Sequence, residues 1–151
     1  MTITQPFLVH AARRRSPWRV IAGGSDTSGS VMFGDAHMPP RTAGMPRHVH
    51  THEDESIYVI SGVLTVEVGD QRFEAGPGGF VWLPRQVPHT YANLSDETVW
   101  TVGVTSPAGL ENLFAEQLEY YARLSGEPDP AVLRAMHEQY GIQPVDGIPL
   151  I

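Results

Sequence analysis

The chain contains no cysteine and no lysine, and each absence removes a class of chemistry. Without cysteine there is no disulfide framework and no thiolate, either as a nucleophile or as a soft metal ligand. All ten basic residues are arginine, so covalent catalysis through a lysine Schiff base is excluded. Histidines and carboxylates remain as the groups that can carry metal or acid–base chemistry.

Positive charge and long apolar runs are also scarce. The formal net charge of −7 over 151 residues argues against a nucleic acid as partner. No apolar run is long enough to span a membrane. An arginine triplet stands at residues 13–15 without the apolar stretch of an export signal, so we expect a cytoplasmic protein. The length predicts one domain with a real core, residues 1–151.

The most informative stretch is residues 48–55, which read HVHTHEDE. Side chains on a strand alternate between its two faces, so His48 and His50 point the same way and can chelate one ion. Residues 56–62 are typical of a strand ending at a turn glycine, and a hairpin through residues 51–54 would return Glu55 beside the histidines. His89 follows a proline-bounded turn and can arrive from a neighbouring strand as a third imidazole.

Three imidazoles and one carboxylate suit one divalent transition metal: Fe, Mn, Co, Ni, Cu or Zn. Calcium is disfavoured because the set offers too few oxygen ligands. A six-coordinate ion with four protein ligands keeps two open positions for water, dioxygen or a chelating substrate. We therefore predict a metal held by His48, His50, Glu55 and His89.

Two motifs in this region resemble those of the cupin superfamily. The first family motif, G-x5-H-x-H-x(3,4)-E-x6-G, is matched at His48, His50, Glu55 and Gly62, although only three residues separate Gly44 from His48. The second, G-x5-P-x-G-x2-H-x3-N, is matched at Gly78, Pro84, His89 and Asn93, with Gln86 standing where the family has glycine. The resemblance implies that the same four ligands bind the metal.

The other histidines and acidic residues of this region are not expected to bind the metal. Counting from Gly44 at the family spacing would select His50 and His52, but Glu55 would then follow too closely. We assign His52 a supporting or solvent role, and expect Glu53 and Asp54 to be solvated loop carboxylates. The histidines without sequence partners are expected to be structural or exposed; they are His10, His37 and His137.

Many short strands separated by glycine and proline turns predict an all-β sandwich or barrel. With the cupin motifs, this means a double-stranded β-helix, or jelly roll, over about residues 18–106. We expect strands at 31–37, 56–60, 63–68, 71–74, 80–83, 89–94 and 99–104, and a loop at 23–29.

A short helical tail is expected over about residues 107–142. Apolar residues fall at helical spacing between Leu110 and Leu124. A second helix should begin at Asp129-Pro130 and end at Gly141. We expect this tail to pack against the outer wall of the barrel, with a lid over the cavity mouth as the alternative.

The segment 107–114, PAGLENLF, and the first motif resemble small single-domain cupins similar to quercetin 2,3-dioxygenase. That resemblance implies a dioxygenase acting on a phenolic or enolic, flavonol-like small molecule, with Glu55 as ligand and catalytic base. Tyr91 shares the strand face of His89 and is a candidate for the substrate pocket; Trp82 and Phe33 are further candidates.

Two other functional classes stay open. One is a non-oxidative metal-dependent isomerase or polyketide cyclase, which would use the same ligands. The other is a small-molecule-binding cupin without catalysis. The resemblance also implies a homodimer, for which residues 7–9 and 18–21 offer strands at a sheet edge.

Overall fold

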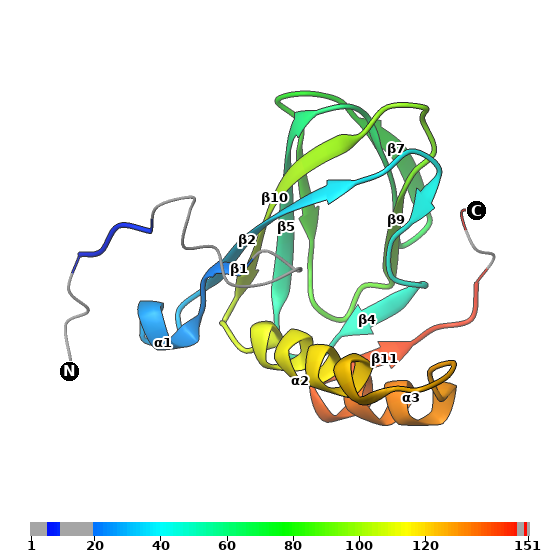
Figure 1. The fold of residues 1–151 in the computed structure, drawn as a ribbon. Helices are drawn as coiled ribbons and strands as arrows, with labels where there is room; N and C mark the ends of the chain where they lie inside the picture. The colour runs from blue at the N-terminus through cyan, green and yellow to red at the C-terminus, as the bar shows by residue number, and fades with distance from the viewer. Residues whose placement is uncertain (1–5, 10–19, 148–149, 151) are drawn as a thin grey trace.

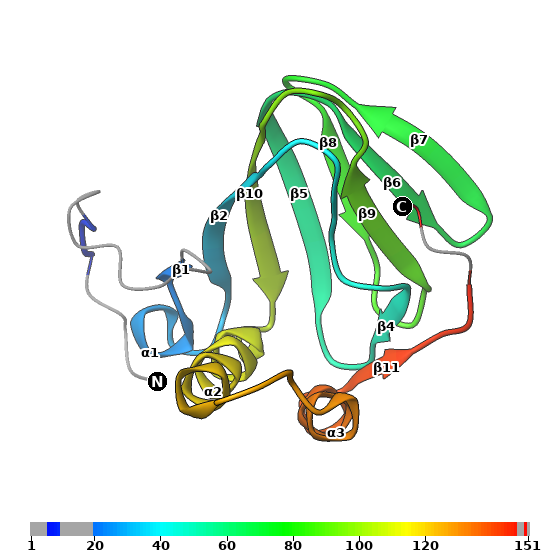
Figure 2. The same ribbon diagram turned by 45° about the vertical axis from the view of Figure 1, so that its right-hand side comes forward.

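The computed structural model describes residues 6–9, 20–147 and 150. Its strands form two antiparallel sheets that face each other (Figures 1 and 2). The first sheet has the spatial order β1 (Val20–Ala22), β2 (Met32–Met38), β10 (Val99–Ser106), β5 (Asp54–Ser61) and β8 (Phe80–Leu83). The second has the order β11 (Ile142–Pro144), β4 (His48–His50), β9 (His89–Asn93), β6 (Leu64–Val68) and β7 (Gln71–Ala75), and β3 (Thr42–Ala43) pairs with β9.

Alternation along the strands builds the main core between the sheets. In β5, Ile57 and Val59 are buried at 4% and 0% exposure, whereas Tyr58 between them is 45% exposed. Each buried side chain packs on partners from the facing sheet, and burial of this kind is the dominant favourable contribution to folding. The core cluster consists of Met38, Ile57, Val59, Leu64, Val66, Ala75, Val81, Leu83 and Val99. The all-β, double-stranded β-helix prediction is thus confirmed.

The helical tail forms α2 (Leu110–Arg123) and α3 (Pro130–Gln139). As predicted, Asp129 caps α3, accepting a hydrogen bond from the Ala131 backbone N–H at 2.8 Å, and Gly141 follows the helix with a φ of 75°. Figures 1 and 2 place both helices at one end of the barrel, α2 below β10 and α3 beside β11, not along the outside of a sheet. Their contacts form a second core cluster of Met32, Leu110, Leu113 and Ile142.

Three short elements differ from the sequence expectations. The 23–29 segment contains one helical turn, α1 (Gly24–Thr27), where a loop was expected. It is stabilised by a distant contact, because the Gly24 N–H donates to Oε1 of Glu111 at 2.6 Å. β3 and β11 were not expected, and β11 pairs with β4 so that Ile142 lies opposite His50.

The N-terminal strands proposed for subunit exchange are only partly described. Residues 7–9 form no strand, and residues 18 and 19 lie outside the described residues. The homodimer therefore stays a prediction. None of the helices within residues 20–147 has the length and hydropathy needed to cross a bilayer.

Gln86, the departure from the second motif, adopts the backbone conformation that a glycine would. Its φ is 65°, in the left-handed region that non-glycine residues rarely occupy. Its backbone N–H donates to the His50 carbonyl at 2.8 Å, and its side-chain amide donates to the Thr51 carbonyl at 3.3 Å. The turn before β9 thus keeps its shape without the glycine and remains bonded to β4.

This conformation makes a prediction about stability. We expect Gln86→Val to lower the free energy of unfolding by roughly 1–2 kcal/mol, because a β-branched side chain is strained at positive φ. Gln86→Gly should stay within about 1 kcal/mol of the parent protein, since relief of strain offsets the lost amide contact and the greater freedom of the unfolded chain. Urea denaturation measures both, and equal stability of the valine variant and the parent would contradict the argument.

Candidate metal centre

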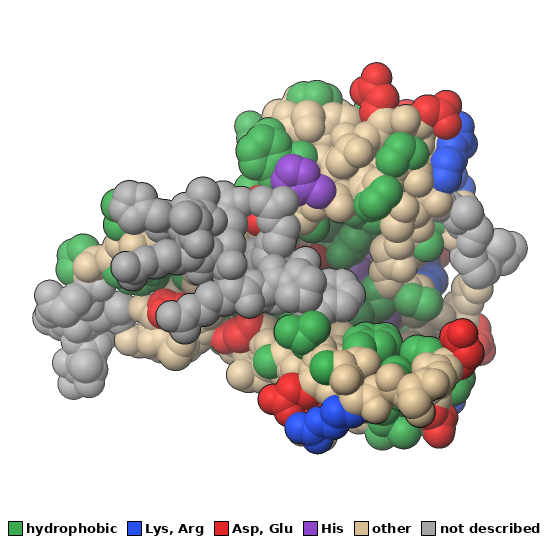
Figure 3. Space-filling model, viewed as in Figure 1, with side chains coloured by type: hydrophobic (Ala, Val, Ile, Leu, Met, Phe, Trp, Pro, Cys, Tyr) green, Lys and Arg blue, Asp and Glu red, His purple; other side chains and the backbone are tan. Residues whose placement is uncertain are grey.

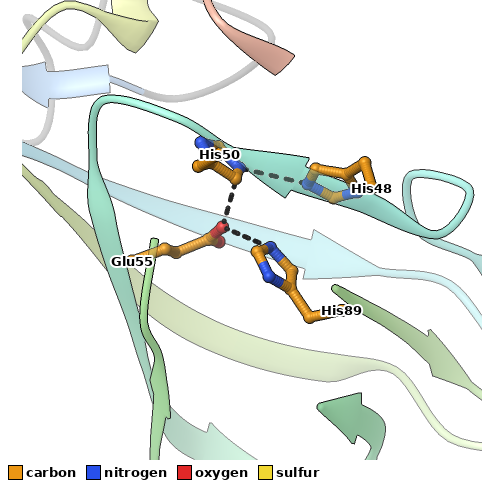
Figure 4. Close-up of side chains that lie close together, drawn as sticks. All are labelled: His48, His50, Glu55 and His89. Atoms are coloured by element: carbon orange, nitrogen blue, oxygen red, sulfur yellow. Dashed lines mark hydrogen bonds and ion pairs between the residues drawn. The ribbon is translucent and has the colours of Figure 1, made fainter. Parts of the chain in front are cut away.

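Four ionisable side chains from two sheets meet inside the barrel (Figure 4). His48 and His50 lie on β4, and His89 lies on β9 directly opposite His48 in the strand register. Glu55 comes from β5 in the other sheet and faces the three imidazoles. One potential ligand atom from each residue lies within 4.8 Å of all the others. The predicted residues are therefore brought together, and the choice of His48 and His50 over His52 is supported by this geometry.

The imidazoles are oriented by hydrogen bonds on their outward nitrogens. Nδ1 of His48 donates to the Pro46 carbonyl at 2.8 Å, and Nδ1 of His89 donates to the Val87 carbonyl at 3.0 Å. A carbonyl oxygen can only accept, so in the neutral rings the proton sits on Nδ1 and Nε2 keeps its lone pair. These Nε2 atoms are the ones that face the centre.

The inward atoms have the spacing of ligands around one ion. Nε2 of His48 lies 3.1 Å from Nε2 of His50, and Oε2 of Glu55 lies 3.5 Å from the His50 Nε2 and 3.6 Å from the His89 Nε2. Two nitrogens about 2.1 Å from a metal and at right angles to each other lie about 3 Å apart. Nε2 of His89 is also buried without a hydrogen-bond partner among the described residues. The donor set could therefore hold one divalent transition metal.

Burial sets the protonation of the group. Burial and the neighbouring rings of His89 and His50 lower the pKa of His48 to about 4, so this imidazole is neutral near pH 7. Burial by itself would raise the pKa of Glu55, but the surrounding imidazoles of His89, His50 and His48 outweigh burial and lower the pKa. Neutral imidazoles and an ionised carboxylate are the forms that bind a metal.

Glu53 is not the solvated loop carboxylate that the sequence suggested. It is 4% exposed, and its Oε2 lies 3.4 Å from Nδ1 of His50. Asp54 instead belongs to β5 and forms an ion pair with Arg85 at 2.8 Å. His52 is exposed, in agreement with the solvent role expected for it.

Two of the three remaining histidines lie in the described part of the chain, and both agree with their expected roles. The ring centre of the exposed His37 lies 5.1 Å from that of Trp100, with the two rings tilted. His137 contacts Gln117, whose side-chain nitrogen is 2.9 Å from Nε2 of His137. Both are structural or exposed, as expected. His10 lies outside the described residues.

The three candidates for the substrate pocket lie in different places, two on the outside of the barrel and one against its core. Trp82 and Phe33 are 52% and 36% exposed, on the outer face of the first sheet, so neither lines the interior. The neighbours of Trp82 along β8, Val81 and Leu83, take the inward positions at 1% exposure each. Tyr91 packs against the main core, and burial together with Glu55 raises the pKa of its phenol, so its part in substrate binding stays a prediction.

A pocket of about 220 Å³ adjoins the centre at the end of the barrel covered by the helices. Ile142 and Pro144 of β11 pair with His50 and His48 and share their side of the sheet. These two residues, His48 itself, and Leu133 and His137 of α3 are among the residues lining it. Figure 3 shows the surface hollowed between barrel and helices, with histidine side chains visible in the hollow. Of the four candidate ligands, His48 is the one that lines this pocket.

The lowered pKa of His48 predicts acid sensitivity in the metal-free protein. An unfolded chain takes up the His48 proton below about pH 6.5, whereas the folded protein resists it until about pH 4. The free energy of unfolding is therefore highest above pH 6.5 and falls as the pH is lowered to about 4. Protonation of His48 alone should lower it by roughly 2 kcal/mol between pH 7 and pH 5. Urea denaturation after chelation measures the slope, which should be shallower in His48→Gln. Equal slopes would contradict the assignment.

Comparison with known proteins agrees with the geometry. Residues 34–104 match the family model described as the cupin domain. The chain is 26% identical to quercetin 2,3-dioxygenase of Bacillus subtilis (strain 168) over 96 residues. These aligned residues make up 64% of this chain. The matched part is only 28% of that enzyme's length, so the chain spans well under half of it.

Solved structures support the same fold. An uncharacterised protein with a double-stranded β-helix domain from Klebsiella pneumoniae aligns with a TM-score of 0.54 at 20% identity, covering 67% of this chain and 84% of that one. A predicted oxalate decarboxylase from Thermotoga maritima aligns with a TM-score of 0.59 at 15% identity, covering 67% and 99%. The match of residues 34–104 to the cupin-domain model, together with the two facing sheets and the histidine and glutamate cluster, identifies the chain as a member of the cupin superfamily.

Proposed function

We propose that this protein is a divalent-metal-dependent dioxygenase that acts on a phenolic or enolic small molecule of the flavonol type. The observation that carries the proposal is the placement of Glu55, a carboxylate of lowered pKa, facing the imidazoles of His48, His50 and His89 inside the barrel. The 26% identity to quercetin 2,3-dioxygenase over 96 residues supports the reaction class.

A divalent transition metal at this point supplies a Lewis acid and, for a redox-active ion, one-electron chemistry toward dioxygen. Glu55 has a free lone pair at neutral pH and accepts the proton of the substrate hydroxyl, which leaves an electron-rich enolate or phenolate. The burial of His50 and His89, 2% and 0% exposed, keeps bulk water from the reacting atoms. Both atoms of dioxygen enter the product, so the reaction needs no external reductant.

The substrate and dioxygen enter from the end of the barrel near α3. The pocket beside His48 has mostly apolar walls, formed in part by Met45, Leu133 and Ile142, which suits a planar aromatic molecule. Its position on the same side of the sheet as His48 and His50 brings a bound hydroxyl toward the four ligands.

Oxygen consumption with a flavonol tests the proposal. We expect the protein, stripped with a chelator and reloaded separately with Fe, Mn, Co, Ni, Cu or Zn, to consume one dioxygen per substrate with at least one of these metals. His89→Leu keeps a similar side-chain volume but lacks the nitrogen, and it should lose at least about 100-fold in metal affinity together with the activity. His52→Ala removes an exposed histidine outside the group and should retain both.

Other outcomes of the same experiment identify the alternatives. Turnover of an enol or phenol substrate under strict anaerobiosis would overturn the dioxygenase and favour an isomerase or cyclase with the same ligands. Binding without turnover across a broad panel of flavonols, phenols and enols would favour a small-molecule-binding cupin. Equal metal binding by His89→Leu and the parent protein would remove the site on which every version depends.

A further inference from the structure

Glu53 is a buried carboxylate that the proposed reaction does not use. It lies between His52, which is exposed, and Asp54, which pairs with Arg85, yet it is itself only 4% exposed. An acidic side chain is costly to bury unless it is paired or hydrogen-bonded. The contacts of Glu53 therefore identify what stabilises it there.

The first contact is with a metal ligand. Oε2 of Glu53 lies 3.4 Å from Nδ1 of His50, while Nε2 on the opposite side of the same ring lies 3.5 Å from Oε2 of Glu55. The His50 ring thus stands between two carboxylates, one on each nitrogen. Each carboxylate can accept a hydrogen bond from the nitrogen it faces, so Glu53 favours a proton on Nδ1 and Glu55 favours one on Nε2. A metal bound at Nε2 requires the proton on Nδ1, where Glu53 accepts its hydrogen bond.

The second contact is with the start of a helix. A Cβ built on Gly109, the residue before α2, would lie 3.7 Å from Oε1 of Glu53. The first N–H groups of a helix lack partners within it and carry partial positive charge, which favours an anion beside them. The side chain of Glu53 thus lies near the residue that precedes α2, a helix of 14 residues.

His50 differs in this respect from the other two imidazoles. Nδ1 of His48 and Nδ1 of His89 each donate to a backbone carbonyl two residues earlier, Pro46 and Val87. Within the described part of the chain, His50 is the ligand whose Nδ1 contacts a side chain. A carboxylate partner on the far nitrogen of an imidazole fixes the ring and raises its basicity as a metal ligand.

We infer that Glu53 is a positioning residue of the metal centre: its carboxylate holds the His50 ring with Nδ1 protonated and Nε2 turned toward the other three ligands. Glu53 itself does not touch the metal or the substrate. The effect of Glu53 on metal affinity rests on the metal site of the proposed function. The effect of Glu53 on the His50 ring rests only on the contact between these two residues.

Zinc titration of the chelator-treated protein by calorimetry tests the effect on affinity. Glu53→Leu removes the acceptor and should weaken zinc binding by roughly 10–100-fold. Glu53→Gln keeps an oxygen that can accept from Nδ1 and should weaken it less, and it serves as the test if the leucine variant does not fold. Asp54→Asn makes the same change of charge at the next residue and should bind zinc as the parent does. Parent-like affinity in both Glu53 variants would overturn the inference.

Long-range ¹H–¹⁵N spectra of the metal-free protein test the effect on the ring separately. We expect Glu53→Leu to shift the His50 proton from Nδ1 toward Nε2 relative to the parent, and Glu53→Gln to shift it less, with His48 and His89 unchanged. An unchanged His50 tautomer in Glu53→Leu would overturn the inference even if affinity falls. A parent protein that binds no zinc would instead refute the metal site, and the spectra would still decide the role of Glu53.

Discussion

Three imidazoles and one carboxylate are buried against one another where the two sheets face, and the surrounding structure has to make that burial tolerable. Isolated ionisable groups are unfavourable in an apolar interior unless they are neutral or paired. The chain keeps His48 neutral and bonds the outer nitrogen of its ring to the Pro46 carbonyl. Nε2 of His48 and Nε2 of His50 face each other at 3.1 Å, a spacing that suits two ligands of one cation.

The barrel alone does not build this centre, because the segment after residue 107 is bonded to β4 and to the loop that joins β4 to β5. β11 pairs with β4, and the Thr51 backbone N–H and side-chain hydroxyl both donate to the Gly141 carbonyl at 2.9 Å. Glu53 lies against the start of α2. The helical tail therefore has two roles: it covers the end of the barrel where the pocket lies, and it fixes the loop from residue 51 to residue 54.

The ligands were predictable from the sequence because local rules govern them. Strand alternation places His48 and His50 on one face, and Glu55 follows at hairpin distance. His89 was identified by resemblance to the second cupin motif rather than by periodicity. The helices were predictable in the same way, from apolar spacing in α2 and from the Asp129 cap in α3.

The errors occurred where the sequence carries no local signal. Residues 80–83 are all apolar, so alternation could not tell that Trp82 faces outward. Glu53 is buried beside His50 and near Gly109, which is 56 positions further along the chain, whereas its charge alone suggested solvent exposure. β11 has three residues, one of them proline, which is too short for a periodic pattern.

The most direct test of the account is a crystal structure of the metal-loaded protein with anomalous scattering at the absorption edge of the metal. The account predicts one peak inside the barrel, about 2.0–2.2 Å from Nε2 of each of the three imidazoles and from a carboxylate oxygen of Glu55. A peak at the exposed His52, or none inside the barrel at saturating metal, would contradict it.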